Sequence, residues 1–324
     1  MEEVTSPIPM LRYFFLLPLS LCFSTSLLVA AGGPTFTDPK EATAKDPDFI
    51  TQGEYAGNLD GKPVGVQLVA EGSGKFAAVL YPGGLPGAGF SGDKATRLKG
   101  TATGGQITLP GLTGTMASGK ITFPGGTLSR MNRESPTVGA KAPAGAIVLF
   151  DGKSPDAFLD GKLDGDTLMQ GVTSKQLWKN FSLHIEFKIP YMPEARGQGR
   201  GNSGCYLQGR YEVQMLDSFG LEGENNECGG IYTIGSPKVN MAFPPLSWQT
   251  YDIEYTQAVY DASGKKTANA RTTVKHNGVI VQDNIELDHA TTASPLKEGP
   301  TPGPIHLQEH GTPVRYRNIW VVEK

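Results

Sequence analysis

The sequence predicts an all-β protein with two β domains, the larger of which is an antiparallel sandwich or jelly roll. Short β-prone runs recur along the 324 residues, and glycine-rich turns separate them. Several runs alternate apolar and polar side chains, which is typical of half-buried strands. Almost no segment has the 3.6-residue period of a helix. No βαβ alternation is present either, which excludes Rossmann folds and parallel-stranded barrels.

The N-terminal 31 residues are predicted to be a signal peptide. Arg12 is followed by a long apolar run that ends in small residues, with Val29 and Ala31 at the −3 and −1 positions of a cleavage site. The run approaches the length of a membrane anchor, but a proline and several Ser/Thr residues favour cleavage. We therefore expect an exported protein, periplasmic or secreted, with no stable membrane insertion after cleavage.

Four further segments are expected after the signal peptide. Residues 32–48 are polar and contain prolines, which predicts a flexible N-terminal tail. A small Gly-rich β domain of unknown role is expected over 49–134, and a Pro/Gly/Ala-rich linker over 135–146. The larger β domain follows at 147–324. The runs that predict strands in the small domain are 64–70, 75–81, 105–111 and 119–125.

The larger domain contains longer alternating strands. Residues 181–189 place five apolar side chains on one face, and 248–260 alternate in the same way. Asn277-Gly278 lies between two β runs within 271–287, which strongly predicts a hairpin. His184 and His276 fall on faces that look outward, and we assign them no role.

Composition excludes some classes of function. A net charge of −3 offers no basic surface of the kind that binds nucleic acid. The Cys and His residues lack the spacing of a zinc site. Cys205 and Cys228 are compatible either with a disulfide or with two buried thiols.

Three strand-like segments near the C-terminal half carry polar side chains between apolar ones. A sheet face with carboxylate, amide, imidazole and guanidinium groups can hydrogen-bond a sugar, and nearby aromatic rings can stack on it. The plainer alternatives are a cross-strand ion pair on a solvated face and aromatic rings in the core. The polar residues are Asn202, Glu212, Gln214, Asp217, His306, Gln308, His310, Arg315 and Arg317, and the aromatic ones are Tyr206, Tyr232 and Trp248.

These segments resemble the 3-keto-disaccharide hydrolase family over roughly residues 146–324. The resemblance implies a concanavalin A-like β-sandwich, a jelly roll, and an exported protein of planctomycete-type bacteria. The small β domain lies outside it. The segments that carry the resemblance are NSG at 202–204, YEVQMLD at 211–217, GGIY at 229–232, Trp248, HNG at 276–278, IHLQEHG at 305–311 and RYRNIWV at 315–321.

Family members of known activity cleave 3-keto-glycosides after a sugar 3-oxidoreductase has oxidised C3. The ketone acidifies the C2 hydrogen, so a base removes it, the C1 substituent leaves by β-elimination, and water then adds. The resemblance implies that Glu212 or His310 is the base or acid and that Arg315 or Arg317 stabilises the enolate. The implied substrate-binding residues are Asn202, Gln214, Asp217, Tyr232, Trp248, His306 and Gln308.

Three alternatives stay open at this point. No cofactor is expected, although Glu212, Asp217, His306 and His310 supply ligand atoms that suit a divalent metal. A non-catalytic, lectin-like module would have the same sandwich. A retaining glycosidase of the laminarinase type would need two carboxylates about 5–5.5 Å apart, and the amide of Gln214 stands where its central Asp is expected.

Overall fold

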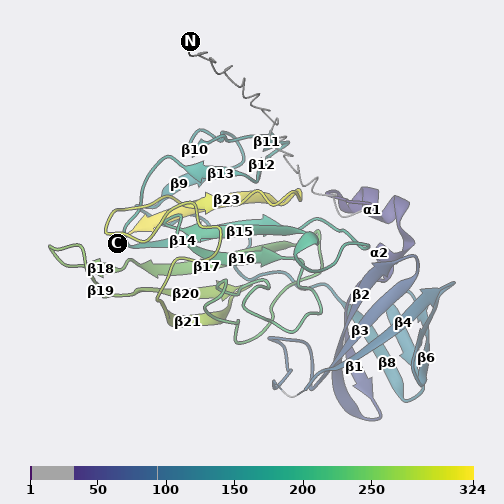
Figure 1. Cartoon of the computed structure of the whole chain (residues 1–324). Helices are drawn as coiled ribbons and strands as arrows, with labels where there is room; N and C mark the ends of the chain where they lie inside the picture. The colour runs from purple at the N-terminus through teal and green to yellow at the C-terminus, as the bar shows by residue number, and fades with distance from the viewer. Residues whose placement is uncertain (2–32, 93) are drawn as a thin grey trace.

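The chain folds into a β barrel and a larger β sandwich that lie side by side (Figure 1). The computed structural model describes residues 33–92 and 94–324, together with Met1. The predicted signal peptide therefore lies outside the described residues. Within the described ranges, every helix is too short or too polar to cross a bilayer. The prediction of an all-β, antiparallel fold is confirmed.

The barrel is an antiparallel meander of eight strands, closed by pairing of β8 with β1. Its strands alternate buried and exposed side chains, and Leu68, Phe76 and Ile107 are among the fully buried residues that fill its interior. The strands are β1 (Gly53–Leu59), β2 (Lys62–Gly72), β3 (Lys75–Pro82), β4 (Thr96–Thr103), β5 (Gln106–Leu109), β6 (Leu112–Ala117), β7 (Lys120–Phe123) and β8 (Gly126–Met131).

The prediction of a flexible tail over 32–48 is wrong, because most of this segment forms two short helices, α1 (Pro39–Lys45) and α2 (Pro47–Thr51). Each helix begins with proline after an aspartate, and the Asp38 and Asp46 carboxylates accept hydrogen bonds from backbone N–H groups of the first turn. Proline at N1 and aspartate at the N-cap both favour helix initiation. The two Asp-Pro pairs were a local helix signal that the polar composition concealed.

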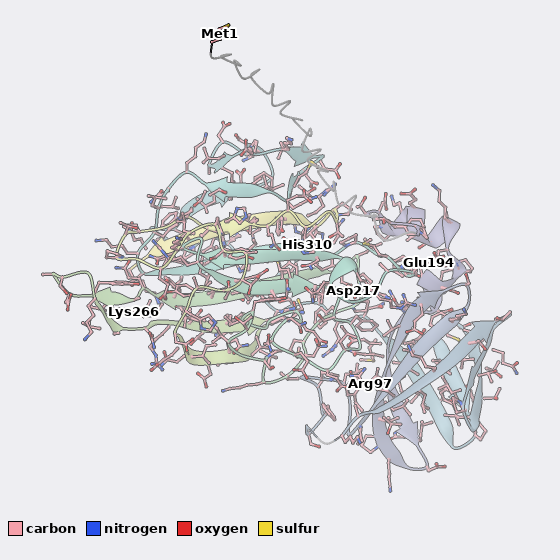
Figure 2. All side chains as sticks on the ribbon, in the orientation of Figure 1. Met1, Arg97, Glu194, Asp217, Lys266 and His310 are labelled. Atoms are coloured by element: carbon pink, nitrogen blue, oxygen red, sulfur yellow. The ribbon has the colours of Figure 1, made fainter. Side chains whose placement is uncertain are left out.

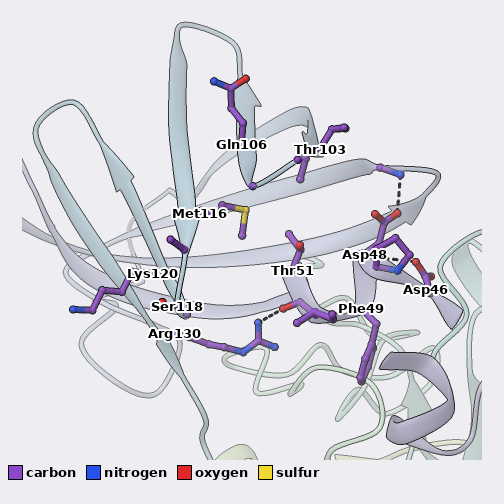
Figure 3. A pocket seen from close by; sticks show the side chains of 18 of the residues that line it. Asp46, Asp48, Phe49, Thr51, Thr103, Gln106, Met116, Ser118, Lys120 and Arg130 are labelled. Atoms are coloured by element: carbon purple, nitrogen blue, oxygen red, sulfur yellow. Dashed lines mark hydrogen bonds between the residues drawn. The ribbon is translucent and has the colours of Figure 1, made fainter. Parts of the chain in front are cut away.

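Helix α2 is fixed to one end of the barrel. Arg130 of β8 donates to the Ile50 carbonyl at 2.6 Å, and the Asp48 carboxylate accepts from the Gly74 N–H at 2.7 Å. Figure 3 shows these contacts around a cavity of about 870 Å³ at the mouth of the barrel. The helices are therefore part of the folded domain.

The sandwich consists of two antiparallel sheets. The five-stranded sheet has the order β10-β13-β22-β15-β16, and the larger sheet has the order β11-β12-β23-β14-β17-β20-β21, with β9 also paired to β23. The strands are β9 (Ile147–Phe150), β10 (Phe158–Leu159), β11 (Leu163–Asp164), β12 (Thr167–Met169), β13 (Val172–Ser174), β14 (Phe181–Lys188), β15 (Asn202–Leu207), β16 (Tyr211–Leu216), β17 (Trp248–Thr256), β20 (Ala270–His276), β21 (Val279–Leu287), β22 (His306–Leu307) and β23 (Arg315–Glu323). A two-residue strand β18 (Val259–Tyr260) pairs with β19 (Lys266–Ala268), and a 3₁₀ turn, η1, spans Gly197–Gly199.

The core of the sandwich lies between its two sheets. Alternation along each strand decides which side chains enter it: Cys205, Val213 and Leu307 of the smaller sheet meet Phe187 and Tyr316 of the larger one. The residues beside them in sequence therefore point outward from their sheets.

The predicted hairpin over 271–287 is confirmed. β20 and β21 are joined through Asn277 and Gly278, which both have positive φ angles, of 49° and 80°. A two-residue turn of the primed type requires this conformation, which asparagine and glycine tolerate.

The segment after the barrel packs on the outer face of the larger sheet. The Gly139 N–H donates to the Glu186 carboxylate at 2.6 Å, and the Asn318 side chain donates to the Ala140 carbonyl at 2.9 Å. This part of the predicted linker is thus a strap held against the sandwich.

Candidate active site

A group of polar side chains covers the outer face of the smaller sheet, where strands β15, β16 and β22 lie side by side. Tyr206 stands directly opposite both Glu212 and His306 in the strand register. The sequence prediction that these strands share one polar face holds here because their odd-numbered neighbours enter the core. We call this group the polar face; it consists of Asn202, Tyr206, Glu212, Gln214, His306 and Gln308.

Glu212 is the carboxylate that β15, β16 and β22 contribute to the polar face. Its side chain is almost completely buried, and among the described residues it forms no ion pair. Burial raises the pKa of Glu212 to about 7, and the Tyr206 hydroxyl partly offsets this effect. A carboxyl group with this pKa can accept or donate a proton near neutral pH.

Tyr206 lies between Glu212 on one side and His306 and Gln308 on the other. The Gln308 side chain donates to the Tyr206 hydroxyl at 3.2 Å, and this hydroxyl donates to the Thr292 carbonyl at 3.2 Å. The His306 ring lies 5.7 Å from the Tyr206 ring, and its Nδ1 lies 2.9 Å from the Thr173 hydroxyl. Burial lowers the pKa of His306, which favours the neutral imidazole.

A residue that sequence reasoning missed, Gln198, joins the two amides of the polar face. Its Oε1 accepts from Asn202 Nδ2 at 3.1 Å and from Gln214 Nε2 at 3.2 Å. Gln198 lies in the 3₁₀ turn η1, within a Gly- and Arg-rich stretch that has no strand alternation. No pattern in the sequence could have pointed to it.

Two acceptor atoms of the polar face are buried without a hydrogen-bond partner in the described part of the chain: Asn202 Oδ1 and Gln308 Oε1. An unpaired buried acceptor costs about 1–3 kcal/mol, so such atoms usually bind a ligand or water. Hydroxyl groups of a sugar would satisfy both, since they can donate hydrogen bonds.

Tyr232 lies next to the polar face, on the segment after β16. Its backbone N–H donates to the Glu212 carbonyl at 3.3 Å, and its side chain is partly exposed. Its predicted role in binding the substrate stays a prediction.

The prediction that Arg315 or Arg317 acts beside Glu212 is wrong. Both belong to β23 of the larger sheet, and their neighbour Tyr316 points into the core. The arginines therefore project from the opposite outer surface of the sandwich. Arg315 donates to Asp164 at 2.8 Å there, and Arg317 donates to the buried Glu186 at 2.7 Å.

Trp248 and Asp217 are also not part of the polar face. Trp248 begins β17 of the larger sheet, where the Arg317 guanidinium lies 4.1 Å from its ring centroid. Asp217 follows β16, and its carboxylate accepts from Arg200 Nε at 2.6 Å. Asp217 comes directly after the last residue of β16. Because the strand has ended, the two-residue alternation no longer decides the direction of its side chain.

His310 lies beyond the end of β22, on an exposed loop. Thr312 of the same loop bonds to the Asn202 backbone, at 2.7 and 2.8 Å, which places the loop at the Asn202 end of the polar face. The four residues considered as metal ligands are not gathered, because Asp217 is paired with Arg200. Among the described residues, no group of three or more His, Cys, Asp or Glu side chains is arranged to hold a metal ion.

The outer face of the larger sheet carries a second buried cluster, around His184. His184 Nδ1 lies 2.6 Å from the Asp252 carboxylate. Burial opposes ionisation of Glu186, but hydrogen bonds from His184, Asn318, Arg317 and Gly139 outweigh it and lower the pKa of Glu186 to about 2. Because these charges are paired with each other beneath the strap, we regard the cluster as structural.

Both cysteines are buried free thiols. Cys205 points into the sandwich core, and Cys228 Sγ lies 3.1 Å from the Tyr251 hydroxyl. The sequence was compatible with a disulfide or with two buried thiols, and the structure contains two buried thiols.

A buried carboxyl group with a raised pKa, surrounded by amides, a tyrosine and an imidazole, marks the polar face as a candidate functional site. The chain matches the family model of the 3-keto-alpha-glucoside-1,2-lyase-like domain over residues 145–322. It belongs to this family, so the resemblance noted in the sequence is confirmed, and it is a glycosidase-type protein.

The chain is also similar to solved structures, of which the first agrees with this assignment. A crystal structure of a "putative glycosyl hydrolase" from Parabacteroides distasonis is 33% identical, with a TM-score of 0.53, and the match covers 56% of this chain and 85% of that one. A second protein of the same description and organism is 18% identical, with a TM-score of 0.42, and covers 56% of this chain and 94% of its own. No match was found among curated proteins.

Proposed function

We propose that this chain is an exported enzyme that cleaves the glycosidic bond of 3-keto-glycosides by elimination followed by hydration. The observation that carries the proposal is that β15, β16 and β22 bring one carboxylate, Glu212, to the polar face. Hydrolysis by a retaining or inverting glycosidase uses a pair of carboxylates. Elimination beside a ketone needs one base, because the ketone acidifies the hydrogen on C2.

In the proposed reaction, the ionised Glu212 removes the proton from C2 of the bound 3-keto sugar. The electron pair forms an enolate with the C3 carbonyl, and the C1–O bond then breaks to leave a C1=C2 double bond. The departing oxygen takes a proton, which we assign to the exposed imidazole of His310. Water then adds its hydroxyl to C1 and gives its remaining proton to the His310 imidazole, and Glu212 returns its proton to C2.

Groups near Glu212 are suited to the charge that develops on the C3 oxygen. The Gln308 amide is a hydrogen-bond donor within the polar face, and the Tyr206 hydroxyl, which here donates to the Thr292 carbonyl, would turn its proton to the bound substrate. Fixed donors in a buried site stabilise an oxyanion more strongly than water does. They replace the two arginines in the role that the sequence had assigned to those residues.

The substrate chemistry implies a partner reaction. A ketone at C3 must be made before elimination can begin, so we propose that a sugar 3-oxidoreductase acts upstream. If the N-terminal 31 residues are cleaved as a signal peptide, both steps would take place outside the cytoplasm.

The test is to incubate purified protein with 3-keto-trehalose and, separately, with trehalose, and to follow released reducing sugar and enone absorbance. We expect turnover of the keto sugar alone. Turnover of trehalose would instead indicate a conventional glycosidase. Saturable binding of either sugar without turnover would indicate a lectin-like module and contradict the proposal.

Variants separate the two proposed proton transfers. Glu212→Gln should abolish turnover of 3-keto-trehalose. His310→Ala should slow it, and less so for a glycoside whose leaving group is a weakly basic phenol, because such a group departs without protonation. Equal slowing for both leaving groups would remove His310 from the reaction.

A further inference from the structure

The loop between β14 and β15 connects the barrel to the polar face. It starts near Tyr191 and ends at Gly201, and η1 lies within it. Figure 2 shows Glu194 of this loop and Asp217 where the sandwich meets the barrel. The loop therefore contacts two parts of the molecule that are far apart in sequence.

Two arginines hold the loop to the barrel. Arg196 Nη2 donates to the Glu71 carbonyl at 2.8 Å, and both Nη atoms of Arg200 donate to the Ala70 carbonyl at 3.2 Å. Pairing between β2 and β3 is irregular between Ala70 and Gly72. A bulge of this kind takes backbone groups out of the ladder, which leaves these carbonyls available to the loop.

The N-terminal segment holds the start of the same loop. Phe36 and Tyr191 exchange backbone hydrogen bonds of 3.0 Å in both directions, and the Tyr191 hydroxyl donates to the Asp46 carboxylate at 3.0 Å. The barrel domain therefore contacts the loop at its beginning, its middle and its end.

On the other side, the loop presents Gln198 to the polar face. Gln198 Nε2 donates to the Asn226 carbonyl at 2.9 Å, which leaves its Oε1 to accept from Asn202 and Gln214. Gln198 occupies Asn202 Nδ2 with two acceptors, its side-chain Oε1 at 3.1 Å and its backbone carbonyl at 2.9 Å. The remaining atom, Asn202 Oδ1, is the buried acceptor without a partner in the described part of the chain. Gln198 thus sets which atom of Asn202 is free to meet a ligand.

We propose that the barrel positions the substrate-binding side of the polar face, through Arg196 and Gln198. In this arrangement the barrel is a scaffold for the 191–201 loop, and Asn202 Oδ1 accepts a hydrogen bond from a sugar hydroxyl. Arg196 and Gln198 are positioning residues, since neither is the base. The inference rests on the proposed function for the identity of the sugar. The contacts between the barrel, the loop and Asn202 are independent of that function.

The test compares Arg196→Ala, Gln198→Ala and the double variant in the full chain, with 3-keto-trehalose as substrate. In each variant, loss of one hydrogen bond that the sugar makes equally in the ground state and the transition state should raise KM about tenfold and leave kcat unchanged. The double variant should have the KM of Gln198→Ala, because Arg196 acts through Gln198. Arg97→Ala is the matched control. Arg97 pairs with Glu222 and donates to the Gly220 carbonyl across the same domain boundary, and none of the hydrogen bonds or ion pairs between described residues joins it to the 191–201 loop.

Hydrogen exchange supplies a readout that needs no substrate. Arg196→Ala should speed amide exchange at residues 197–203, and Arg97→Ala should not. Unchanged exchange in Arg196→Ala, additive effects in the double variant, or equal effects in Arg97→Ala would overturn the inference. If exchange changes as expected while wild-type protein turns over no keto sugar, the scaffold role stands and the proposed function fails.

Discussion

The carboxylate of Glu212 lies over Gly204, on the neighbouring strand. A methyl group built on Gly204 would be 2.8 Å from both Cγ and Cδ of Glu212, and closer still to Oε1. Gly204 is paired with Gln214, one position along the outer face from Glu212. The glycine therefore provides the space that the carboxylate occupies, and any larger residue would displace it.

Gly204→Ala should reduce turnover of 3-keto-trehalose at least a hundredfold, because the base is moved from its position. The affected atoms belong to the flexible side chain of Glu212, so the fold should survive. Steady-state kinetics and thermal unfolding measure the two effects. Gly299→Ala is the control, because the nearest atom to its new methyl group would be Arg210 Nη2, at 3.9 Å. Its turnover and its thermal stability should stay at wild-type values. Full activity in Gly204→Ala would show that Glu212 is not the base.

The rate of the wild-type enzyme should rise with pH between about pH 5 and about pH 7, as Glu212 ionises. The base must be ionised, and burial raises the pKa of Glu212 to about 7. A profile of kcat/KM between pH 5 and 9 should therefore show one ionisation near neutrality on its acid side. A rate that falls as the pH rises from about 5 to about 7 would mean that the essential form of Glu212 is protonated, as in an acid.

Stability should fall with pH over the same range. The folded state keeps the Glu212 proton between the ordinary pKa of 4.5 and about 7, whereas the unfolded chain releases it, so raising the pH favours unfolding. The loss amounts to roughly 3 kcal/mol by pH 8. Denaturant unfolding at pH 5 and pH 8 should reveal this difference relative to Glu212→Gln, which has no proton to release. Parallel pH dependences in the two proteins would contradict a buried, uncompensated carboxylate.

Arg317→Met should destabilise the protein and leave catalysis nearly intact. The guanidinium pairs with the buried Glu186 on the outer face of the larger sheet, away from Glu212. Removing it leaves a buried carboxylate with one fewer partner, at a cost of about 1–3 kcal/mol. Urea unfolding and kcat/KM measure the two quantities. Arg271→Met, which removes an exposed pair with Glu286, should change unfolding by less than about 1 kcal/mol. A large loss of kcat in Arg317→Met, with stability unchanged, would return Arg317 to the active site.

Local sequence patterns were sufficient where short-range physics decides the structure. The hairpin at Asn277-Gly278 follows from the positive φ angles that these two residues accept. The outward direction of Glu212, Gln214 and His306 follows from the two-residue period of a strand. A local signal also preceded the barrel: Asp38 and Asp46, each followed by proline, cap two helices that the sequence analysis did not predict.

Alternation determined which side chains leave the core together, but only the tertiary structure decided which sheet each strand joins. Arg315 and Arg317 alternate as regularly as His306 and Gln308, yet β23 joins the larger sheet and β22 the smaller. Strand pairing between segments far apart in sequence makes this choice, and a periodic pattern contains no information about it. For the same reason Gln198, which reaches the polar face from a loop held by the barrel, could be found only in the folded chain.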